Sequence, residues 1–295
     1  MINSIAEHNN LLVAGLCTFI APKAFLRGIL SHNTKNGRVE KPVVTLSFDC
    51  DYPKDVEAIP AVLKLLKAHN IRASFACVGH WIEKYPREHL LILEAGHEIV
   101  NHTYSHPDNE ILNPGRQFRF IPRDEKRQEI ERCHEVCLKV LKYEPKGLRV
   151  PHFKNLFTPD IYGILKELGY AFSSSTWLTN TKSFGRPFVV KDFNIVEFPL
   201  SVCPLHPFSV FDTWHSLNTP RLSHRLVHRG QESYCGLFST LLQMGEETGA
   251  YLNVYLDPWD VPSIKGLSDV LSRISDASRF RVSTYEDLLS EAVIL

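Results

Sequence analysis

The 295-residue sequence predicts an α/β barrel. From Val43 onward, short apolar runs rich in β-branched residues alternate with amphipathic segments, which is typical of a parallel sheet with crossover helices. Several such units follow one another, and no glycine-rich nucleotide loop follows a strand, which favours a closed barrel over an open sheet. Polar residues also gather at the predicted strand ends, where barrels carry their catalytic groups.

Each element of this pattern follows from periodicity and from glycine or proline boundaries. The segment 56–69, for example, places Ile59, Val62 and Leu66 on one helical face, and Gly96 ends a later helix. Strands are predicted at residues 43–48, 71–78, 97–101, 147–150, 170–174, 196–200 and 251–256. Helices are predicted at residues 56–69, 82–95, 124–141, 159–168, 231–248 and 264–275.

The expected domain organisation is one barrel domain at 41–295 behind an N-terminal extension and linker at 1–40. A stretch rich in Pro, His and aromatic residues, at 184–229, reads as an insertion that determines substrate choice. Lys plus Arg and Asp plus Glu number 33 each, so no basic excess indicates a nucleic-acid partner. The oligomeric state is not indicated.

The cysteine usage and the N-terminus predict a cytoplasmic protein. The seven cysteines are scattered and odd in number, which suits reduced thiols better than a disulfide framework. The apolar run at 11–21 is too short for a transmembrane helix, and no Lys or Arg precedes it as in a signal peptide. Two interpretations of 11–30 stay open: a helix packed on the domain, or a weak membrane-surface contact helped by Lys23 and Arg27.

Two carboxylates follow the first predicted strand, in the sequence S-F-D-C-D-Y-P. Asp49 and Asp51 are two residues apart, so on a strand both would point to the same side. Two negative charges this close are unfavourable without a partner. A divalent cation bound by Asp51 would relieve the crowding, and Asp49 would then be placed to act as a general base on water. The alternative is a helix cap.

Two histidines follow the third predicted strand. His102 and His106 are four residues apart, a spacing that puts both rings on one face of a helical turn. Together with Asp51 they make a set of two imidazoles and one carboxylate. Three protein ligands with an open position are typical of catalytic zinc, and also of non-haem iron(II).

Two further strand ends carry polar groups. Arg149 lies in an apolar context after the strand at 147–150, where its guanidinium would keep Asp49 ionised and oriented. Asp257 ends the last predicted barrel strand in the sequence V-Y-L-D-P-W-D. Trp259, two residues on, would form an apolar wall of the site or belong to the core.

These motifs together resemble the polysaccharide deacetylases of the NodB-homology type, carbohydrate esterase family 4, over residues 42–260. Residues 102–107 read H-T-Y-S-H-P and match the family's H-[ST]-x-x-H-P motif, which is the most specific signal in the chain. The Asp pair and R-V-P-H at 149–152 are similar to two other family motifs. The resemblance implies a distorted (β/α)7 TIM-like barrel that removes acetyl groups from sugars with a divalent metal, usually Zn²⁺.

The resemblance also implies residue roles. Asp49 would be the general base, and Asp51, His102 and His106 would be the metal ligands. Arg149 would orient the base. In the motif that contains Pro151, the backbone N–H of the next residue, His152, would bind the oxyanion.

Two departures from the family pattern concern the acid groups. Trp177 of the fourth motif is present, but Ser173–Ser175 replace the aspartate that orients the arginine. In the late motif, Asp257 replaces the histidine that serves as general acid. Because an ordinary aspartic acid has a pKa of about 3.9, Asp257 would need an upward pKa shift to be protonated near neutral pH, and burial beside Asp49 would supply it. Alternatively, a histidine supplies the proton: His152, His206 or His215.

The sequence therefore predicts a metal-dependent deacetylase that hydrolyses an N-acetyl or related acyl amide on a sugar or glycan. One alternative is a barrel that binds metal and sugar without catalysis, which Asp257 favours. Others are an amide hydrolase with a non-sugar substrate and an iron(II) oxygenase, whose usual all-β fold the strand-helix alternation contradicts.

Overall fold

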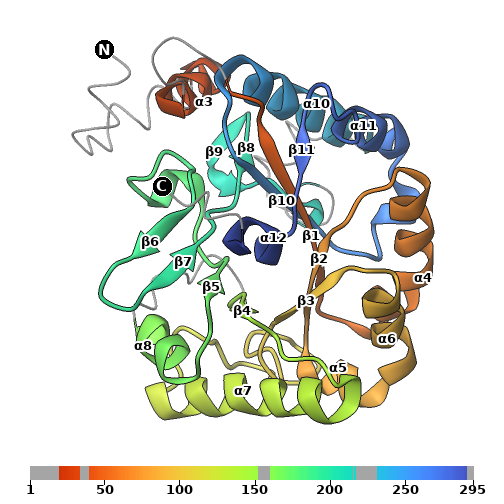
Figure 1. The fold of residues 1–295 in the computed structure, drawn as a ribbon, viewed down its shortest axis with the longest axis vertical. Helices are drawn as coiled ribbons and strands as arrows, with labels where there is room; N and C mark the ends of the chain where they lie inside the picture. The colour runs from red at the N-terminus through yellow and green to blue at the C-terminus, as the bar shows by residue number, and fades with distance from the viewer. Residues whose placement is uncertain (1–19, 34–39, 152–159, 215, 217–230, 291–295) are drawn as a thin grey trace.

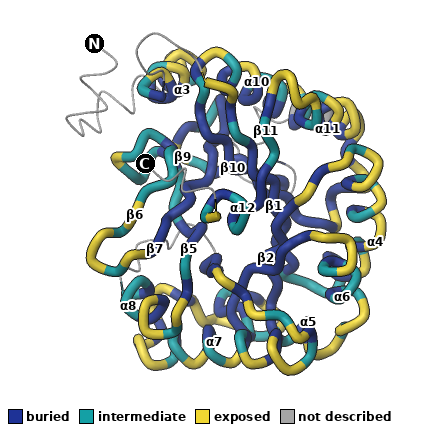
Figure 2. The backbone as a smooth tube through the Cα atoms, in the orientation of Figure 1, coloured by how far each residue is buried: buried dark blue, intermediate teal, exposed yellow. Residues whose placement is uncertain are grey.

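The computed structural model describes residues 20–33, 40–151, 160–214, 216 and 231–290. A curled sheet surrounds the molecular centre, and helices surround the sheet (Figure 1). Most residues of the sheet are buried, except those of β6 (Phe188–Val190) and β11 (Arg281–Val282), and exposed residues lie mostly on the outer side of the helices (Figure 2). This arrangement is the distorted TIM-like barrel that the sequence predicts.

The main sheet is parallel along most of its length because crossover helices connect successive strands. Its strand order is β10-β1-β2-β3-β4-β5-β7-β6, and β11 also pairs with β1. Every pairing on this path is parallel except that of β6 with β7. The strands are β1 (Val43–Cys50), β2 (Ser74–Cys77), β3 (Glu98–Asn101), β4 (Gly147–Leu148), β5 (Phe172–Ser173), β6 (Phe188–Val190), β7 (Ile195–Glu197), β10 (Leu252–Leu256) and β11 (Arg281–Val282).

Most of the helices lie on the outer side of the sheet (Figure 1). In α4, for example, Ile59, Val62 and Leu66 are buried, as the sequence pattern predicts. The helices are α3 (Pro22–Leu30), α4 (Pro53–Ala68), α5 (Gly79–Lys84), α6 (Pro86–Glu94), α7 (Arg123–Val136), α8 (Asp160–Glu167), α10 (Gln231–Thr248), α11 (Leu267–Ile274) and α12 (Tyr285–Ser290).

The segment after β7 closes the ring of strands against β10. The backbone N–H of Ser201 donates to the carbonyl of Asn253 over 2.8 Å, and the N–H of Asn253 donates to the Ser201 hydroxyl over 3.0 Å. A small antiparallel pair, β8 (Val202–Cys203) and β9 (His206–Val210), follows this contact. Part of the stretch 184–229 therefore belongs to the main sheet, as β6 and β7, and 215 and 217–230 lie outside the described residues.

The short helix α12 lies inside the ring of strands (Figure 1). Glu98, the first residue of β3, accepts hydrogen bonds from the N–H groups of Tyr285 and Glu286, both over 3.0 Å. The Tyr285 ring packs against Phe172 and Phe198, each at 5.1 Å between centroids. Because Glu98 opens its strand, α12 closes the barrel at the N-terminal ends of the strands and points Tyr285 inward.

Two expectations about helices need correction. The helix predicted at 82–95 is two helices, α5 and α6, because Pro86 lacks an N–H and begins a new helix. The helix predicted at 124–141 ends as regular α-helix at Val136, and a π-helical turn, η2 (Cys137–Leu141), follows.

The N-terminal segment is described from residue 20. In α3, Phe25, Leu26, Ile29 and Leu30 are buried, and Arg27 pairs with a residue of α10. This half of the segment 11–30 is thus packed on the domain, and residues 11–19 lie outside the described residues. Within the described part of the chain, no helix combines the length and apolarity needed to cross a membrane.

Candidate functional site

The site begins at the carboxyl end of β1. Asp49 and Asp51 both face the imidazole of His102, as their spacing on a strand predicts. The Nε2 atom of His102 is 3.1 Å from Asp51 Oδ1 and 4.0 Å from Asp49 Oδ2. The peptide carbonyl of Asp51 is held by two donors, Trp81 Nε1 and Asn109 Nδ2, each over 2.8 Å. This backbone anchoring fixes the place of the second carboxylate.

The two histidines converge through a loop rather than the helical turn predicted from their spacing, so the expected reason for their pairing was wrong. β3 ends at Asn101, and the residues from His102 to His106 form no helix. Thr103 and His106 have positive φ angles of 64° and 48°. The Asn101 side chain accepts a hydrogen bond from Thr103 N over 2.8 Å. Such strained conformations persist where surrounding contacts impose them, and they are frequent at functional sites.

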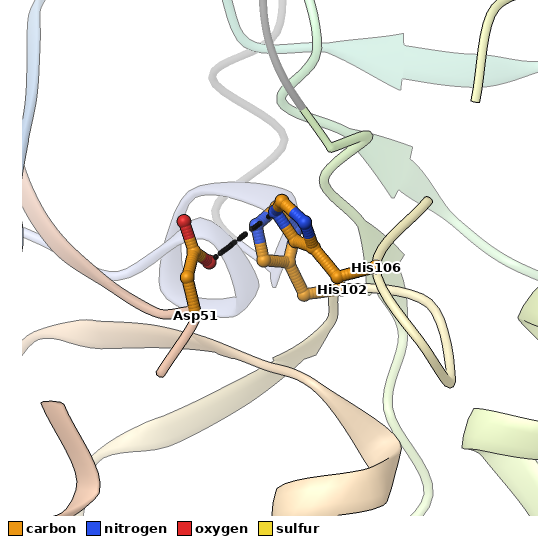
Figure 3. Close-up of side chains that lie close together, drawn as sticks. All are labelled: Asp51, His102 and His106. Carbon is orange, nitrogen blue, oxygen red and sulfur yellow. Dashed lines mark ion pairs between the residues drawn. The ribbon is translucent and has the colours of Figure 1, made fainter. Parts of the chain in front are cut away.

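Asp51, His102 and His106 form a three-residue ligand set (Figure 3). One ligand atom from each residue lies within 4.8 Å of the other two, and His106 Nε2 is 3.5 Å from Asp51 Oδ1. His102 Nδ1 donates to the carbonyl of Arg149 over 2.7 Å, so its Nε2 keeps a lone pair facing Asp51. A ligating histidine whose other nitrogen donates to a carbonyl is typical of metal sites. The residues therefore fit a divalent cation.

Asp49 and Arg149 form a buried ion pair next to this ligand set. Arg149 Nη1 donates to Asp49 Oδ1 and also, over 3.0 Å, to the Ser47 hydroxyl. Both charged side chains are almost completely buried. Burial raises the pKa of Asp49, and the positive charge of Arg149 opposes that rise. The pair can thus present an oriented carboxylate whose basicity is greater than that of an exposed aspartate.

Neutral hydroxyls hold the other side of the Arg149 guanidinium. Ser174 accepts from Nη2 through its hydroxyl over 3.1 Å and from Nε through its carbonyl over 3.3 Å. Tyr285 of α12 accepts from Nη2 as well. The Tyr285 hydroxyl in turn donates to Asn253 Oδ1 over 2.8 Å. Ser174, one of the serines that replace the family's aspartate, therefore contacts Arg149. Tyr285 of α12 also contacts Arg149, and the sequence analysis did not identify this tyrosine.

Asp257 is buried after β10 in an acidic environment. The Thr213 hydroxyl donates to Asp257 Oδ2 over 2.8 Å, and the N–H of Asp257 donates to the Thr213 hydroxyl over 2.7 Å. Burial and the nearby carboxylates of Asp55 and Asp51 raise the pKa of Asp257 well above its ordinary value. The carboxylates that raise the pKa of Asp257 include Asp55 and Asp51, whereas the sequence analysis had expected Asp49. The arrangement favours the protonated form of Asp257.

Asp55 is a second site carboxylate, and sequence reasoning missed it. Its Oδ2 accepts from Tyr52 N over 2.9 Å, and its Oδ1 accepts from Trp259 N over 3.2 Å. Burial, and then the charge of Asp51, raise the pKa of Asp55 to about 8. An aspartate three residues after the helix N-cap is the signal that could have shown its capping role. It joins the start of α4 to the loop after β10.

The remaining predicted site residues lie as follows. Trp177 is half-buried and packs against the apolar core, and Pro151 is buried beside Arg149. Trp259 is 52% exposed, so it does not belong to the core. His206 is half-buried in β9. His152 and His215 lie outside the described residues.

The fold and this site define an α/β barrel with a metal-type ligand set at the carboxyl ends of its strands. Residues 36–173 match the family model of polysaccharide deacetylases, which is just under half of the chain. Residues 36–173 are therefore assigned as similar to this family. The matched region contains Asp49, Asp51, both histidines and Arg149, whereas Asp257 and Tyr285 lie beyond it.

Comparisons with other proteins agree with this assignment. Over 117 residues the chain is 38% identical to the peptidoglycan-N-acetylglucosamine deacetylase of Bacillus cereus, a match that covers 40% of this chain and 38% of that protein. The chain therefore aligns with well under half of this relative.

Two solved structures share the fold. A Mycobacterium smegmatis structure named for the polysaccharide deacetylases matches with a TM-score of 0.69, at 18% identity, over 88% of this chain and 93% of that chain. A CE4 family pseudoenzyme from Bacillus anthracis matches with a TM-score of 0.54, at 16% identity, over 85% and 66% of the two chains.

Proposed function

We propose that this protein is a metal-dependent deacetylase that hydrolyses an N-acetyl amide on a sugar or glycan. The observation that carries the proposal is the contact between two groups of residues. The ligand set of Asp51, His102 and His106 adjoins the buried pair of Asp49 and Arg149. A cation site alone would suit many functions, but a buried carboxylate oriented toward it by an arginine suits hydrolysis.

The cation would be held by Asp51 Oδ1 and by the Nε2 atoms of His102 and His106. Two imidazoles and one carboxylate are ligands that zinc prefers, so Zn²⁺ is the proposed ion. A bound divalent cation polarises an acyl oxygen and lowers the pKa of water. His102 contributes a fixed ring orientation, because its Nδ1–H is bonded to the carbonyl of Arg149.

Asp49 accepts the proton of the attacking water. Arg149 holds this carboxylate from the side away from His102, and the hydroxyls of Ser47, Ser174 and Tyr285 hold the arginine. An anchored base loses little orientational freedom during the reaction, which is a large part of catalysis by positioning.

Asp257 donates a proton to the leaving amine. Burial and the nearby carboxylates raise the pKa of Asp257, which favours its protonated form, and the Thr213 hydroxyl donates to only one of its carboxyl oxygens, Oδ2. His206 is the alternative donor within the described residues. The backbone N–H of His152, after the buried Pro151, is proposed as the oxyanion donor, and Trp177 and Trp259 as substrate walls.

The proposed substrate class is an N-acetylated amino sugar, free or within a glycan. The named activity of the B. cereus relative is deacetylation of N-acetylglucosamine in peptidoglycan, and other relatives are named as chitooligosaccharide deacetylases. A cytoplasmic location is proposed on the strength of the free thiols among the described cysteines.

A non-catalytic, sugar-binding barrel is the second candidate, and one observation favours it. Asp257 stands where the family resemblance leads us to expect a histidine, and a structural neighbour is named as a pseudoenzyme. The preserved pair of Asp49 and Arg149 argues against this reading, since a binding protein needs no oriented base.

Acetate release tests the proposal. The protein is stripped with a chelator, then assayed with and without added zinc on N-acetylglucosamine, its oligomers and N-acetylated nucleotide sugars. We expect acetate only after zinc is restored. Protein that holds about one zinc per chain and releases no acetate from any of these compounds would favour the non-catalytic candidate.

A further inference from the structure

We propose that Glu197 is a positioning residue for both halves of the proposed site. Through the loop at 174–176, it fixes the guanidinium of Arg149 and the imidazole of the metal ligand His102. The inference rests on the proposed function and deepens it with a residue that lies beyond the region matched by the family model.

Glu197, the last residue of β7, is a fully buried carboxylate. Its Oε1 accepts from the N–H groups of Ser175 and Thr176, over 2.7 and 2.9 Å, and from the Thr176 hydroxyl over 2.9 Å. Its Oε2 accepts from the Tyr162 hydroxyl over 3.1 Å. Burial raises the pKa of Glu197, whereas these donors lower it. Because a buried carboxylate depends on its hydrogen bonds, three donors from two successive residues fix the loop against it.

The first route from this loop leads to the proposed base. The carbonyl of Ser174 and the N–H of Ser175 belong to one peptide unit. The N–H side of this unit donates to Glu197, and the carbonyl side accepts from Arg149 Nε over 3.3 Å. A carboxylate at one end polarises the peptide and strengthens the bond at the other end. Arg149 in turn donates to Asp49, so the orientation of the base depends on Glu197.

The second route leads to a metal ligand. The hydroxyl of Ser175 accepts from the N–H of Val150 over 3.0 Å. This N–H and the carbonyl of Arg149 belong to one peptide unit, and the carbonyl accepts from His102 Nδ1 over 2.7 Å. The peptide that orients the His102 ring is therefore held from its far side by the residue that Glu197 holds.

The sheet brings these groups together. β4, β5 and β7 are neighbours, and Leu148, Ser173 and Glu197 are paired in register across them (Figure 1). The loops after β4 and β5 therefore start at one level, next to Glu197. The serines at 173–175 stand where the family resemblance leads us to expect an aspartate that orients the arginine. Glu197 supplies a buried carboxylate that is linked to Arg149 through one peptide unit.

The experiment uses the full chain and two readouts. Zinc affinity of the metal-free protein is measured by competition with a chromogenic chelator, and kcat and KM for acetate release are measured at saturating zinc. Glu197→Ala removes the carboxylate, and Glu197→Gln keeps an amide oxygen for the loop. Tyr162→Phe is the matched control, because it removes the one hydrogen bond of Glu197 that comes from outside the loop. Ser174→Ala and Ser175→Ala separate the two routes.

We expect Glu197→Ala to weaken zinc binding about tenfold, as for loss of a group that supports a metal ligand. Its kcat should also fall about tenfold with little change in KM, because the base is less well oriented. Glu197→Gln should recover most of both losses. Ser175→Ala should weaken zinc binding, whereas Ser174→Ala should lower kcat and leave zinc affinity in place. Tyr162→Phe should change neither.

An unchanged zinc affinity or an unchanged kcat in Glu197→Ala would overturn the inference, and so would losses of equal size in Tyr162→Phe. If Glu197→Ala does not fold, an unchanged zinc affinity in Ser175→Ala or an unchanged kcat in Ser174→Ala would overturn it. Zinc affinity that depends on Glu197, in a protein that releases no acetate, would support the positioning role and contradict the deacetylase function instead.

Discussion

Two buried carboxylates of the proposed site, Asp49 and Asp257, have different surroundings. Asp49 faces a guanidinium and an imidazole. Asp257 faces a threonine hydroxyl and a group of other carboxylates. Burial raises the pKa of both, but the charge of Arg149 opposes the rise at Asp49, whereas Asp55 and Asp51 increase it at Asp257.

The difference teaches that neighbouring charges, and not residue type, assign the two roles. Under the proposed function, the aspartate paired with an arginine would serve as the base, and the aspartate crowded by acids would keep its proton and serve as the acid. The replacement of a histidine by Asp257 therefore need not remove the acid from the site. Each prediction below tests one side of this comparison.

The largest expected effect is on the base. Asp49→Asn should lower kcat for acetate release by about 10³-fold, because an amide cannot accept the water's proton. The zinc content should not change, since Asp51, His102 and His106 remain, and zinc analysis of the purified variant is the control. A variant that keeps more than about a tenth of the wild-type rate would contradict the role of Asp49 as general base.

The second effect should depend on the leaving group. Asp257→Asn should lower kcat on an N-acetyl amide by about 10²-fold, because the amine must be protonated as it leaves. The same variant should hydrolyse an aryl acetate ester at close to the wild-type rate, because a phenolate leaves without a proton. Asp49→Asn should lose both activities. Equal losses on amide and ester in Asp257→Asn would show that Asp257 is not the acid.

A smaller effect is expected from the group that holds Arg149. Tyr285→Phe removes one acceptor of the guanidinium but keeps the ring between Phe172 and Phe198. We expect kcat to fall about tenfold with little change in KM, because the base is then less well oriented. Tyr234→Phe is the matched control, since it removes a buried hydroxyl elsewhere in the core. If the two variants lower kcat equally, Tyr285 contributes to packing and does not orient the base.

The smallest expected effect is on stability in the absence of metal. Between the ordinary pKa of an aspartate and the raised pKa of Asp257, the folded state binds a proton that the unfolded state releases, so stability falls as pH rises. Asp257→Asn removes this contribution. In chelator, the Tm of the variant relative to wild type should therefore increase as the pH rises above the ordinary pKa of an aspartate. A constant difference in Tm would mean that the pKa of Asp257 is not raised.

Much of the barrel was predictable because its signals are local. Apolar runs and amphipathic periods identified the strands and most helices, and the helix at 231–248 has the predicted bounds. The positions of Asp51, His102, His106 and Arg149 were also predictable, because parallel strands present their carboxyl ends at one face of a barrel.

Other features depend on contacts between distant residues or on backbone angles that periodicity does not encode. The positive φ angles of Thr103 and His106 set how the histidines meet, and spacing alone suggested a helical turn. Helix α12 is too short to show a clear hydrophobic periodicity in the sequence. Its contact with Arg149, which lies 136 residues earlier than Tyr285, could therefore not be predicted. The raised pKa of Asp257 comes from burial and from Asp55 and Asp51, which lie far from Asp257 in the sequence, and only the fold brings these groups together.

The pH dependence of kcat/KM for zinc-dependent acetate release, measured for wild type and Asp257→His, tests the central claim most directly. If Asp49 is the base and Asp257 the acid, the wild-type profile is bell-shaped. The alkaline limb, which reports the acid, should move to a different pH in Asp257→His. The acidic limb, which reports the base, should stay at the same pH. An alkaline limb that does not move when Asp257 is replaced would contradict the assignment of the two carboxylates.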